Sequence, residues 1–126
     1  NLVQLSEIIR DAPAGFSVLS GEDALNYPIL CCGGQGVISV TANLKPRLLH
    51  DMVEACQQDN YAKAREIHLH LLELNRVLFI ETNPIPVKSA LAEMGMISPE
   101  IRLPLCQLET ANLEKLQTVM HNYKLI

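Results

Sequence analysis

Two short apolar runs in the first third of the chain restrict the folds that it can adopt. Residues 16–20 and 37–41 have the composition of β-strands, and the second run is apolar on both faces, as in a strand covered on two sides. Sixteen residues separate Ser20 from Val37, which is far too many for a hairpin and enough for a crossover helix. The spacing predicts two parallel strands joined by a right-handed crossover.

Helical periodicity accounts for most of the remaining chain. Apolar residues recur at helical spacing over residues 2–12 and 24–32, with Pro28 expected in a first turn or at a kink. Thr110 is the expected N-cap of the last helix. Beyond Asn43 the pattern is helical, apart from a turn at 83–86 and an extended segment at 101–108, with stripes over 48–56, 61–79, 87–94 and 110–120.

Two parallel strands do not form a stable sheet by themselves. Both edges would carry unpaired backbone groups, and parallel sheets need cover on both faces. A part of an α/β barrel, or a half-barrel that pairs with another chain, would supply the missing strands. The chain also opens at Asn1 and enters a helical stripe at once, so we expect it to be cut from a longer protein.

The charge balance argues against two classes of partner. The sequence has 10 Lys and Arg against 14 Asp and Glu and no basic run, so we expect no nucleic acid partner and no anionic membrane surface. The longest apolar stretches fall well short of the roughly 20 residues of a membrane span. We therefore expect neither binding to a membrane surface nor a membrane-spanning segment.

The four cysteines are spaced neither as CxxC pairs nor as a compact secreted framework, which favours a reducing, cytoplasmic location. The adjacent Cys31 and Cys32 invite a redox or metal interpretation. They follow Ile29 and Leu30 in an apolar helix, however, and cysteine is among the most buried residue types. The pattern favours core packing for both.

The glycine-rich run at residues 33–36 lies in the wrong place for a phosphate loop. Phosphate loops lead from a strand into a helix N-terminus, whereas this run leads from a helix into a strand. The run therefore predicts a left-handed helix cap and a tight turn. The loops after the two strands, residues 20–23 and 41–43, are better candidates for chemistry, because ligands bind beyond the carboxyl ends of parallel strands.

Glu22 and Asp23 stand in the first of these loops. Neighbouring carboxylates can split their pKa values and serve as an acid/base pair. Acidic residues at a helix start also stabilise the helix dipole, and residues i and i+1 on a helix do not face each other. The spacing favours the capping role and leaves the acid/base pair as the alternative.

Histidine and lysine side chains complete the set of candidates. His68 and His70 point roughly 200° apart on a helix, so they cannot bind one ion together. Glu66 and His70 could, but no third ligand is visible, and we predict an exposed pair and no metal site. Of the lysines nearest the candidate loops and the proline turn, Lys45 and Lys88, the first is expected to be solvated rather than to form a Schiff base.

Four motifs carry more information than periodicity: SGED at residues 20–23, GVISVTAN at 36–43, NPIPVK at 83–88 and RLPL at 102–105. Their order and spacing closely resemble those of the dihydrodipicolinate synthase family. The resemblance covers essentially all 126 residues, but only the C-terminal part, somewhat under half, of that family's (β/α)8 barrel chain. It implies an α/β fold, with the last two parallel strands of a TIM barrel in residues 1–44 and the last barrel helix with a C-terminal helical extension in residues 45–126.

The resemblance implies a pyruvate-dependent lyase of the aldolase type in lysine (diaminopimelate) biosynthesis. In the family, a lysine on the sixth strand forms an imine with pyruvate, and the resulting enamine attacks aspartate semialdehyde without a cofactor. That lysine falls in a segment before Asn1. The resemblance therefore implies no catalytic residue within this chain and no activity of the chain alone.

Four residues match family positions at the substrate pocket. Gly21 matches a position lining the pocket, where the lack of a Cβ allows close backbone approach. Ile38 matches the position whose backbone contacts bound pyruvate near the imine. Glu22 and Asp23 match residues at the pocket rim.

The resemblance also implies the partners of the intact enzyme: pyruvate, aspartate semialdehyde, the missing N-terminal barrel half and further copies in a homo-oligomer, a tetramer in the family. A sialic acid or sugar-acid lyase of the same superfamily is an alternative whose motifs match less well. A second alternative is a non-catalytic helical module that binds a partner, against which the unpaired parallel strands argue.

Overall fold

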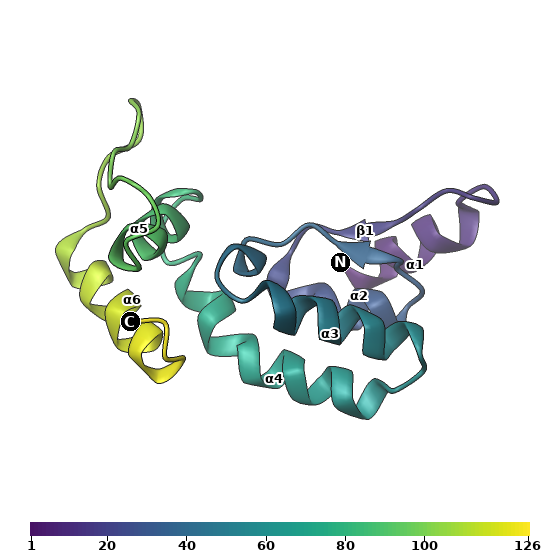
Figure 1. Cartoon of the computed structure of the whole chain (residues 1–126). Coiled ribbons are helices and arrows are strands. Elements are labelled where there is room, and N and C mark those ends of the chain that lie inside the picture. The colour runs from purple at the N-terminus through teal and green to yellow at the C-terminus, as the bar shows by residue number, and fades with distance from the viewer.

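The structure, a computed structural model, describes residues 1–126 and consists mainly of helices, with a two-stranded parallel sheet near α1, α2 and α3 and with α5 and α6 at the opposite end (Figure 1). In chain order its elements are α1 (Leu2–Asp11), β1 (Leu19–Ser20), the 3₁₀ turn η1 (Asp23–Leu25), α2 (Asn26–Cys31), β2 (Gly36–Val37), the 3₁₀ turn η2 (Thr41–Asn43), α3 (Pro46–Gln57), α4 (Tyr61–Val77), α5 (Ile85–Glu93) and α6 (Thr110–Asn122). The predicted order of helix, strand, helix, strand and then helices is confirmed.

The two strands are parallel, with Leu19 opposite Gly36 and Ser20 opposite Val37, which confirms the predicted crossover. Each strand is only two residues long, shorter than the predicted 16–20 and 37–41. The second run ends early because its last residues bend into η2 instead of continuing the strand. Hydrogen bonds to a buried carboxylate, described below, hold that bend.

The crossover between the strands consists of η1 and α2. Pro28 lies in the first turn of α2, where its missing N–H removes no helical hydrogen bond. Gly33 has a φ of +106°, which confirms the interpretation of the glycine run as a left-handed helix cap.

Cys31 and Cys32 are both exposed, so the prediction that they pack in the core is wrong. Helix α2 has only six residues; Ile29 and Leu30 are buried, whereas its last residue, Cys31, and its C-cap, Cys32, lie at the surface. The buried cysteine is Cys56 on α3, and burial raises the pKa of its thiol to about 11.

The core extends from the interface of α3 and α4, against which α2 packs, along α4 to α5 and α6 (Figure 1). Its largest fully buried apolar side chains come from α3, α4 and α6 and from the residue after α4: Met52, Leu71, Leu74, Leu78, Leu116 and Met120. Helices α5 and α6 pack on each other beyond the C-terminal end of α4 (Figure 1). The domain boundary at residue 44 stays a prediction.

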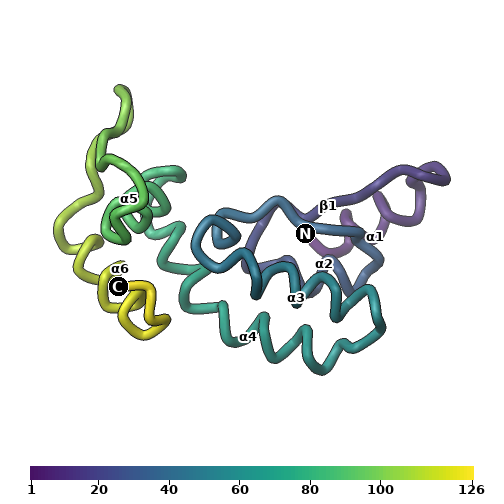
Figure 2. Tube along the Cα trace, viewed as in Figure 1, coloured from purple at the N-terminus to yellow at the C-terminus, as the bar shows by residue number.

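Helix α5 ends at Glu93, and Gly95 follows the C-cap Met94 with a φ of +70°, a left-handed conformation that stops the helix. The following segment has no regular structure and reaches away from α5 and α6 before it returns to α6 (Figure 2). Helix α6 has Glu109 as its N-cap instead of the predicted Thr110. No helix in the structure combines the length and the apolar character needed to span a lipid bilayer.

A large apolar surface is left uncovered on the side of α1 and the sheet. Helix α1 buries none of its residues, and each strand has one edge without a neighbour. The exposed apolar side chains in this region are Leu2, Val3, Ile8, Phe16, Leu19 and Ile38.

We expect the isolated 126-residue chain to self-associate at micromolar concentration, because association would cover both the unpaired strand edges and this apolar surface. Sedimentation velocity measures the result directly. A monodisperse monomer over the whole concentration range would contradict the prediction.

Candidate active site

A cavity of about 460 Å³ opens at the carboxyl ends of β1 and β2. Its first wall comes from the loops that follow the two strands, and its second from the start of α5 and the turn before it. The residues that line it are Gly21, Ile38, Ser39, Val40, Asn43, Asn83, Pro84, Val87, Lys88 and Leu91. The site thus combines segments that lie forty or more positions apart in the sequence.

Gly21 and Ile38, two of the four predicted substrate-binding residues, line this cavity together. No heavy atom lies within 4 Å of the place that a Cβ of Gly21 would occupy. The Ile38 side chain is 70% exposed, unusual for a large apolar residue, and its N–H donates to the Ser20 carbonyl at 2.7 Å. Contact of either residue with a substrate stays a prediction.

Glu22 and Asp23 do not line the cavity, and their carboxylates lie in different environments. Glu22 is exposed, and its side chain accepts a hydrogen bond from the Ala24 N–H at 3.5 Å, which confirms its capping role at η1. Asp23 is only 2% exposed, and contact of Glu22 or Asp23 with a substrate at the pocket rim stays a prediction. Because the two groups are separated in this way, the geometry does not support an acid/base pair.

Asp23 is the centre of a buried polar network that consists of Ser20, Asp23, Asn26, Thr41 and Asn75. Its Oδ2 accepts the backbone N–H groups of Val40 and Thr41 at 2.9 and 3.0 Å. Its Oδ1 accepts from Asn26 Nδ2 at 2.9 Å and from the Ser39 hydroxyl. No cation lies within ion-pairing distance, so these four donors alone stabilise the carboxylate.

The network extends to β1 and to α4. The Ser20 hydroxyl donates to Asn26 Oδ1 at 2.7 Å, and the Thr41 hydroxyl donates to Asn75 Oδ1 at 2.7 Å. Asn75 Nδ2 donates to the Asp23 carbonyl at 3.1 Å. These bonds fix the bend after β2, and that bend supplies Ser39, Val40 and Asn43 to the cavity wall.

Sequence reasoning did not identify Asn26 or Asn75 as part of the site. Asn75 lies beside Leu74 within the buried face of α4, where a polar side chain must find partners. A polar residue in an otherwise apolar helical stripe therefore indicates a buried hydrogen-bonded side chain. It does not indicate which residues are its hydrogen-bond partners.

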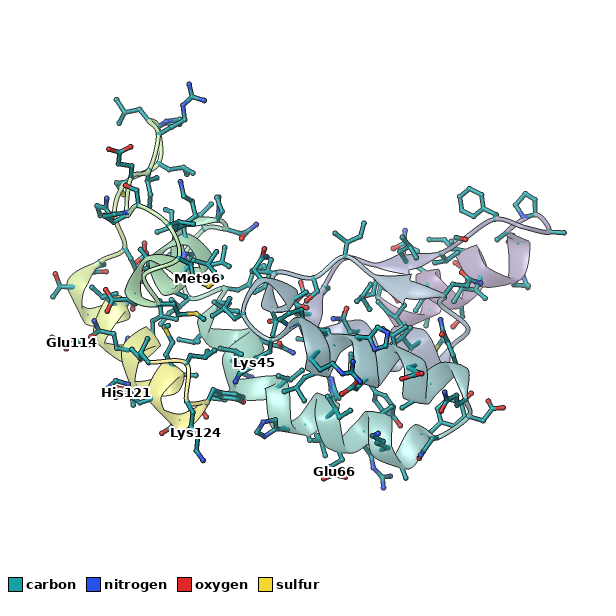
Figure 3. The ribbon with its side chains drawn as sticks, in the orientation of Figure 1. Lys45, Glu66, Met96, Glu114, His121 and Lys124 are labelled. Carbon is teal, nitrogen blue, oxygen red and sulfur yellow. The ribbon has the colours of Figure 1, made fainter.

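The second wall brings in the NPIPVK motif. Asn83, Pro84, Val87 and Lys88 all line the cavity, and Lys88 is its only charged lining residue. The ammonium group of Lys88 donates to the Glu100 carbonyl at 2.7 Å. Lys45, the other lysine considered, is half-buried and lies outside the lining (Figure 3).

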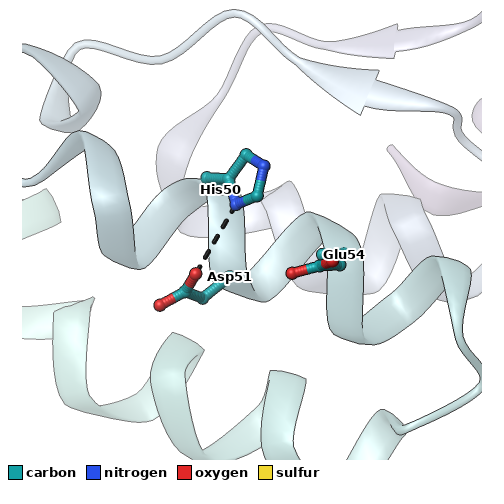
Figure 4. A group of neighbouring side chains, drawn as sticks. All are labelled: His50, Asp51 and Glu54. Atoms are coloured by element: carbon teal, nitrogen blue, oxygen red, sulfur yellow. Dashed lines mark hydrogen bonds and ion pairs between the residues drawn. The ribbon is translucent and has the colours of Figure 1, made fainter.

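No group of side chains at the cavity could hold a metal ion, but three possible ligand side chains lie close together on α3. His50, Asp51 and Glu54 place their ligand atoms within 4.8 Å of one another (Figure 4). His50 and Glu54 are exposed, and Asp51 already pairs with Arg47 at 2.9 Å. Their i, i+1 and i+4 spacing was visible in the sequence and was not considered there.

Glu66 and His70 are both exposed on α4, and Figure 3 shows Glu66 pointing away from the rest of the molecule. His68 is different, because its ring stacks on Tyr27 with 5.5 Å between ring centroids. The His68 Nδ1 atom is buried and has no hydrogen-bond partner. Desolvation lowers the pKa of His68 below its ordinary value of 6.5.

We expect His68 to make the fold less stable as the pH falls. Above pH 6.5 the imidazole is neutral in both states, whereas below it the unfolded chain takes up a proton that the folded chain does not. His68→Phe, which retains a stacking ring, should therefore show a smaller drop in melting temperature between pH 7.5 and pH 5.5. His121→Phe is the matched control, since Figure 3 shows His121 on the outside of α6; an equal effect of both changes would contradict the prediction.

A cavity at the carboxyl ends of parallel strands is the arrangement in which α/β enzymes bind their ligands. The profile of the Dihydrodipicolinate synthetase family matches residues 1–123 of this chain. The chain therefore belongs to that family.

Individual relatives agree with this assignment. The 4-hydroxy-tetrahydrodipicolinate synthase of Archaeoglobus fulgidus is 51% identical over 126 residues, which are 100% of this chain and 44% of that protein. The enzyme of the same name from Citrifermentans bemidjiense is 47% identical over 126 residues, 100% of this chain and 43% of the relative. The chain thus spans less than half the length of the curated relatives that it matches.

Solved structures share the fold. The crystal structure of dihydrodipicolinate synthase from Aquifex aeolicus superposes with a TM-score of 0.97 at 45% identity, over 99% of this chain and 43% of that one. The structure of the Thermotoga maritima enzyme superposes with a TM-score of 0.96 at 38% identity, over 100% of this chain and 44% of that one.

Proposed function

We propose that this chain is the C-terminal part of a 4-hydroxy-tetrahydrodipicolinate synthase, a (β/α)8 barrel lyase that condenses pyruvate with aspartate semialdehyde in lysine (diaminopimelate) biosynthesis. The observation that carries the proposal is the cavity at the strand ends, where Gly21 and Ile38 meet as the family resemblance implies. The names of relatives that match the whole chain support the same activity.

The covalent step belongs to a lysine outside this chain. Its amine condenses with the pyruvate ketone and releases water to give an imine; loss of a methyl proton gives the enamine, which forms the new carbon–carbon bond with the aldehyde. Lys45 does not reach the cavity lining, and Lys88 is held by the Glu100 carbonyl. Neither replaces the missing nucleophile.

This chain shapes the pocket around that chemistry. The absence of a Cβ at Gly21 leaves room for pyruvate against the strand end. The Ile38 N–H is already bonded to the Ser20 carbonyl, so the Ile38 carbonyl oxygen is the backbone group that remains to contact pyruvate. Closure of the barrel by an N-terminal half, and assembly with further copies, would cover the unpaired strand edges and the apolar surface of α1.

A chimera tests the proposal. The N-terminal part of the Archaeoglobus fulgidus relative is joined to this chain, which replaces the matching 44% of that protein. We expect the chimera to consume pyruvate and aspartate semialdehyde, and to gain a pyruvyl adduct on borohydride reduction, seen by intact mass. The 126-residue chain alone should show neither. A folded chimera that is inactive, or that prefers a sugar aldehyde to aspartate semialdehyde, would contradict the proposal.

A further inference from the structure

Two cysteines from different helices lie where α2 packs against α3. Cys31 is the last residue of α2, and Cys56 is the residue before the last of α3. Both thiols are free. Cys31 is exposed, whereas Cys56 is only 8% exposed. The proposed function uses neither of them.

Two hydrogen bonds near the thiols hold these helix ends together. The Tyr27 hydroxyl donates to the Tyr61 carbonyl at 3.3 Å and so joins α2 to the start of α4. Gln57, which follows Cys56, donates through its Nε2 to the Gln35 carbonyl at 3.5 Å, in the turn after α2. Cα atoms of α2 and α3 approach within 8 Å of one another, and a disulfide needs a Cα separation of about 4.4–6.8 Å.

The Cys31 thiol faces into this contact. Burial raises the pKa of the Cys56 thiol to about 11, and the neighbouring Cys31 thiol adds to the rise through charge repulsion and a hydrogen bond. A hydrogen bond with the same Cys31 thiol raises the pKa of Tyr27. The sulfur of Cys31 therefore lies beside Cys56, although the residue as a whole is exposed. Cys32 follows at position i+1, which faces another direction.

We propose that Cys31 and Cys56 are a redox modification site, which a low-molecular-weight disulfide such as oxidised glutathione converts into a reversible disulfide between α2 and α3. Helix α2 is part of the crossover between β1 and β2, so the bond would fix the element that connects the two strands of the first cavity wall. Disulfides of this kind in reducing compartments are usually transient and respond to oxidants.

The reaction consists of two exchange steps. The Cys31 thiolate attacks one sulfur of the small disulfide, whose S–S bond breaks, and one small thiol leaves with the proton that Cys31 gave up. Cys56 then attacks the Cys31 sulfur of this mixed disulfide, and the second small thiol leaves with the proton of Cys56. The protein is oxidised by two electrons, and the small disulfide is reduced to two thiols.

Exposure assigns the order of the two steps. The oxidant meets Cys31 first because this residue is exposed. Cys56 is buried and has a raised pKa, so little of it is thiolate and its attack is the slower step. We therefore expect the mixed disulfide at Cys31 to appear before the bond between the two helices.

The test oxidises the folded chimera with oxidised glutathione at about pH 8.5, where more of each thiol is thiolate, and maps the products by mass spectrometry. Free thiols are blocked before digestion with trypsin, and cleavage after Arg47 separates Cys56 from Cys31 and Cys32. We expect peptides joined through Cys56. The melting temperature should rise by at least about 5 °C and return on reduction, because the bond closes a chain loop from residue 31 to residue 56.

Two variants identify the partner of Cys56. Cys31→Ala should lose both the joined peptides and the rise in melting temperature. Cys32→Ala is the matched control, because it removes the adjacent exposed thiol, and it should retain both effects. Absence of joined peptides from the folded parent would overturn the inference, as would joined peptides that persist in Cys31→Ala. A bond that lowers the melting temperature would also overturn it, because the two thiols would then have to distort the fold to meet.

This readout is separate from the test of the proposed function. A covalent link is measured and not turnover, so its absence leaves the proposed activity intact. A folded but inactive chimera would overturn the proposed function and leave the thiol pair to its own test. We expect the same joined peptides from the 126-residue chain alone, so the inference does not depend on the folding of the chimera.

Discussion

Asp23→Leu is expected to destabilise the fold by at least about 3 kcal/mol, since it leaves several buried donors without an acceptor at about 1–3 kcal/mol each. The carboxylate accepts hydrogen bonds from the Val40 and Thr41 N–H groups, from Asn26 and from Ser39. Leucine has a similar size but no acceptor, and water has little access because Asp23 is 2% exposed. The bend after β2 would lose the bonds that hold it.

Thermal unfolding of the chimera measures this effect, and we expect a drop in melting temperature of about 10 °C. Glu22→Leu is the matched control, because it removes a neighbouring carboxylate that is exposed and makes one weak capping bond at 3.5 Å. Its cost should stay below about 1 kcal/mol. Similar melting temperatures for the two variants would show that the buried network contributes little.

Gly21→Val is expected to lower kcat/KM for pyruvate by about a hundredfold or more, a loss typical of a misplaced reacting group. A Cβ at this position would have no heavy atom of another part of the chain within 4 Å, so a branched side chain would start from open space beside Ile38. The backbone at Gly21 has no positive φ, and valine is therefore not strained by it. Stability should change by no more than about 0.5 kcal/mol.

Steady-state kinetics and thermal unfolding of the same chimera separate the two effects. Gly21→Ala should give an intermediate loss of activity, because the methyl group occupies part of the same space. Unchanged kinetics for valine would mean that Gly21 is only a turn residue. A large fall in melting temperature would instead indicate that the glycine is needed for folding.

The parallel crossover could be predicted because it depends on local features: two apolar runs, their separation and the cap at Gly33. The strand lengths could not, because they depend on distant partners. The run after Val37 has the composition of a strand, yet Asp23 binds its backbone and bends it. Residue type also led to the wrong prediction that Cys31 and Cys32 are buried. Their exposure depends on where the short helix α2 ends and not on residue type alone.

The candidate site shows the same division. Position after a strand was enough to direct attention to Gly21, and the family resemblance pointed to Ile38. Neither the position after a strand nor the resemblance shows that Lys88 lines the same cavity as Gly21 and Ile38. That arrangement depends on the packing of α3 and α4, which determines where α5 begins. The inward position of Asp23 could not be predicted either, since three of its four donors come from residues sixteen or more positions further along the chain.

Helix α4 connects the two walls of the cavity at the strand ends. Near its C-terminal end, Asn75 binds Asp23 and Thr41 behind the first wall, and the chain then passes after a few residues to Asn83 in the second. Adding or removing one residue within α4 would turn its end by about 100° and shift it by about 1.5 Å. Asn75 would then leave its partners, and the second wall would be displaced at the same time. The number of residues in α4 is therefore constrained by the width of the cavity as well as by core packing, and natural length variation should fall in the segment between α5 and α6 instead.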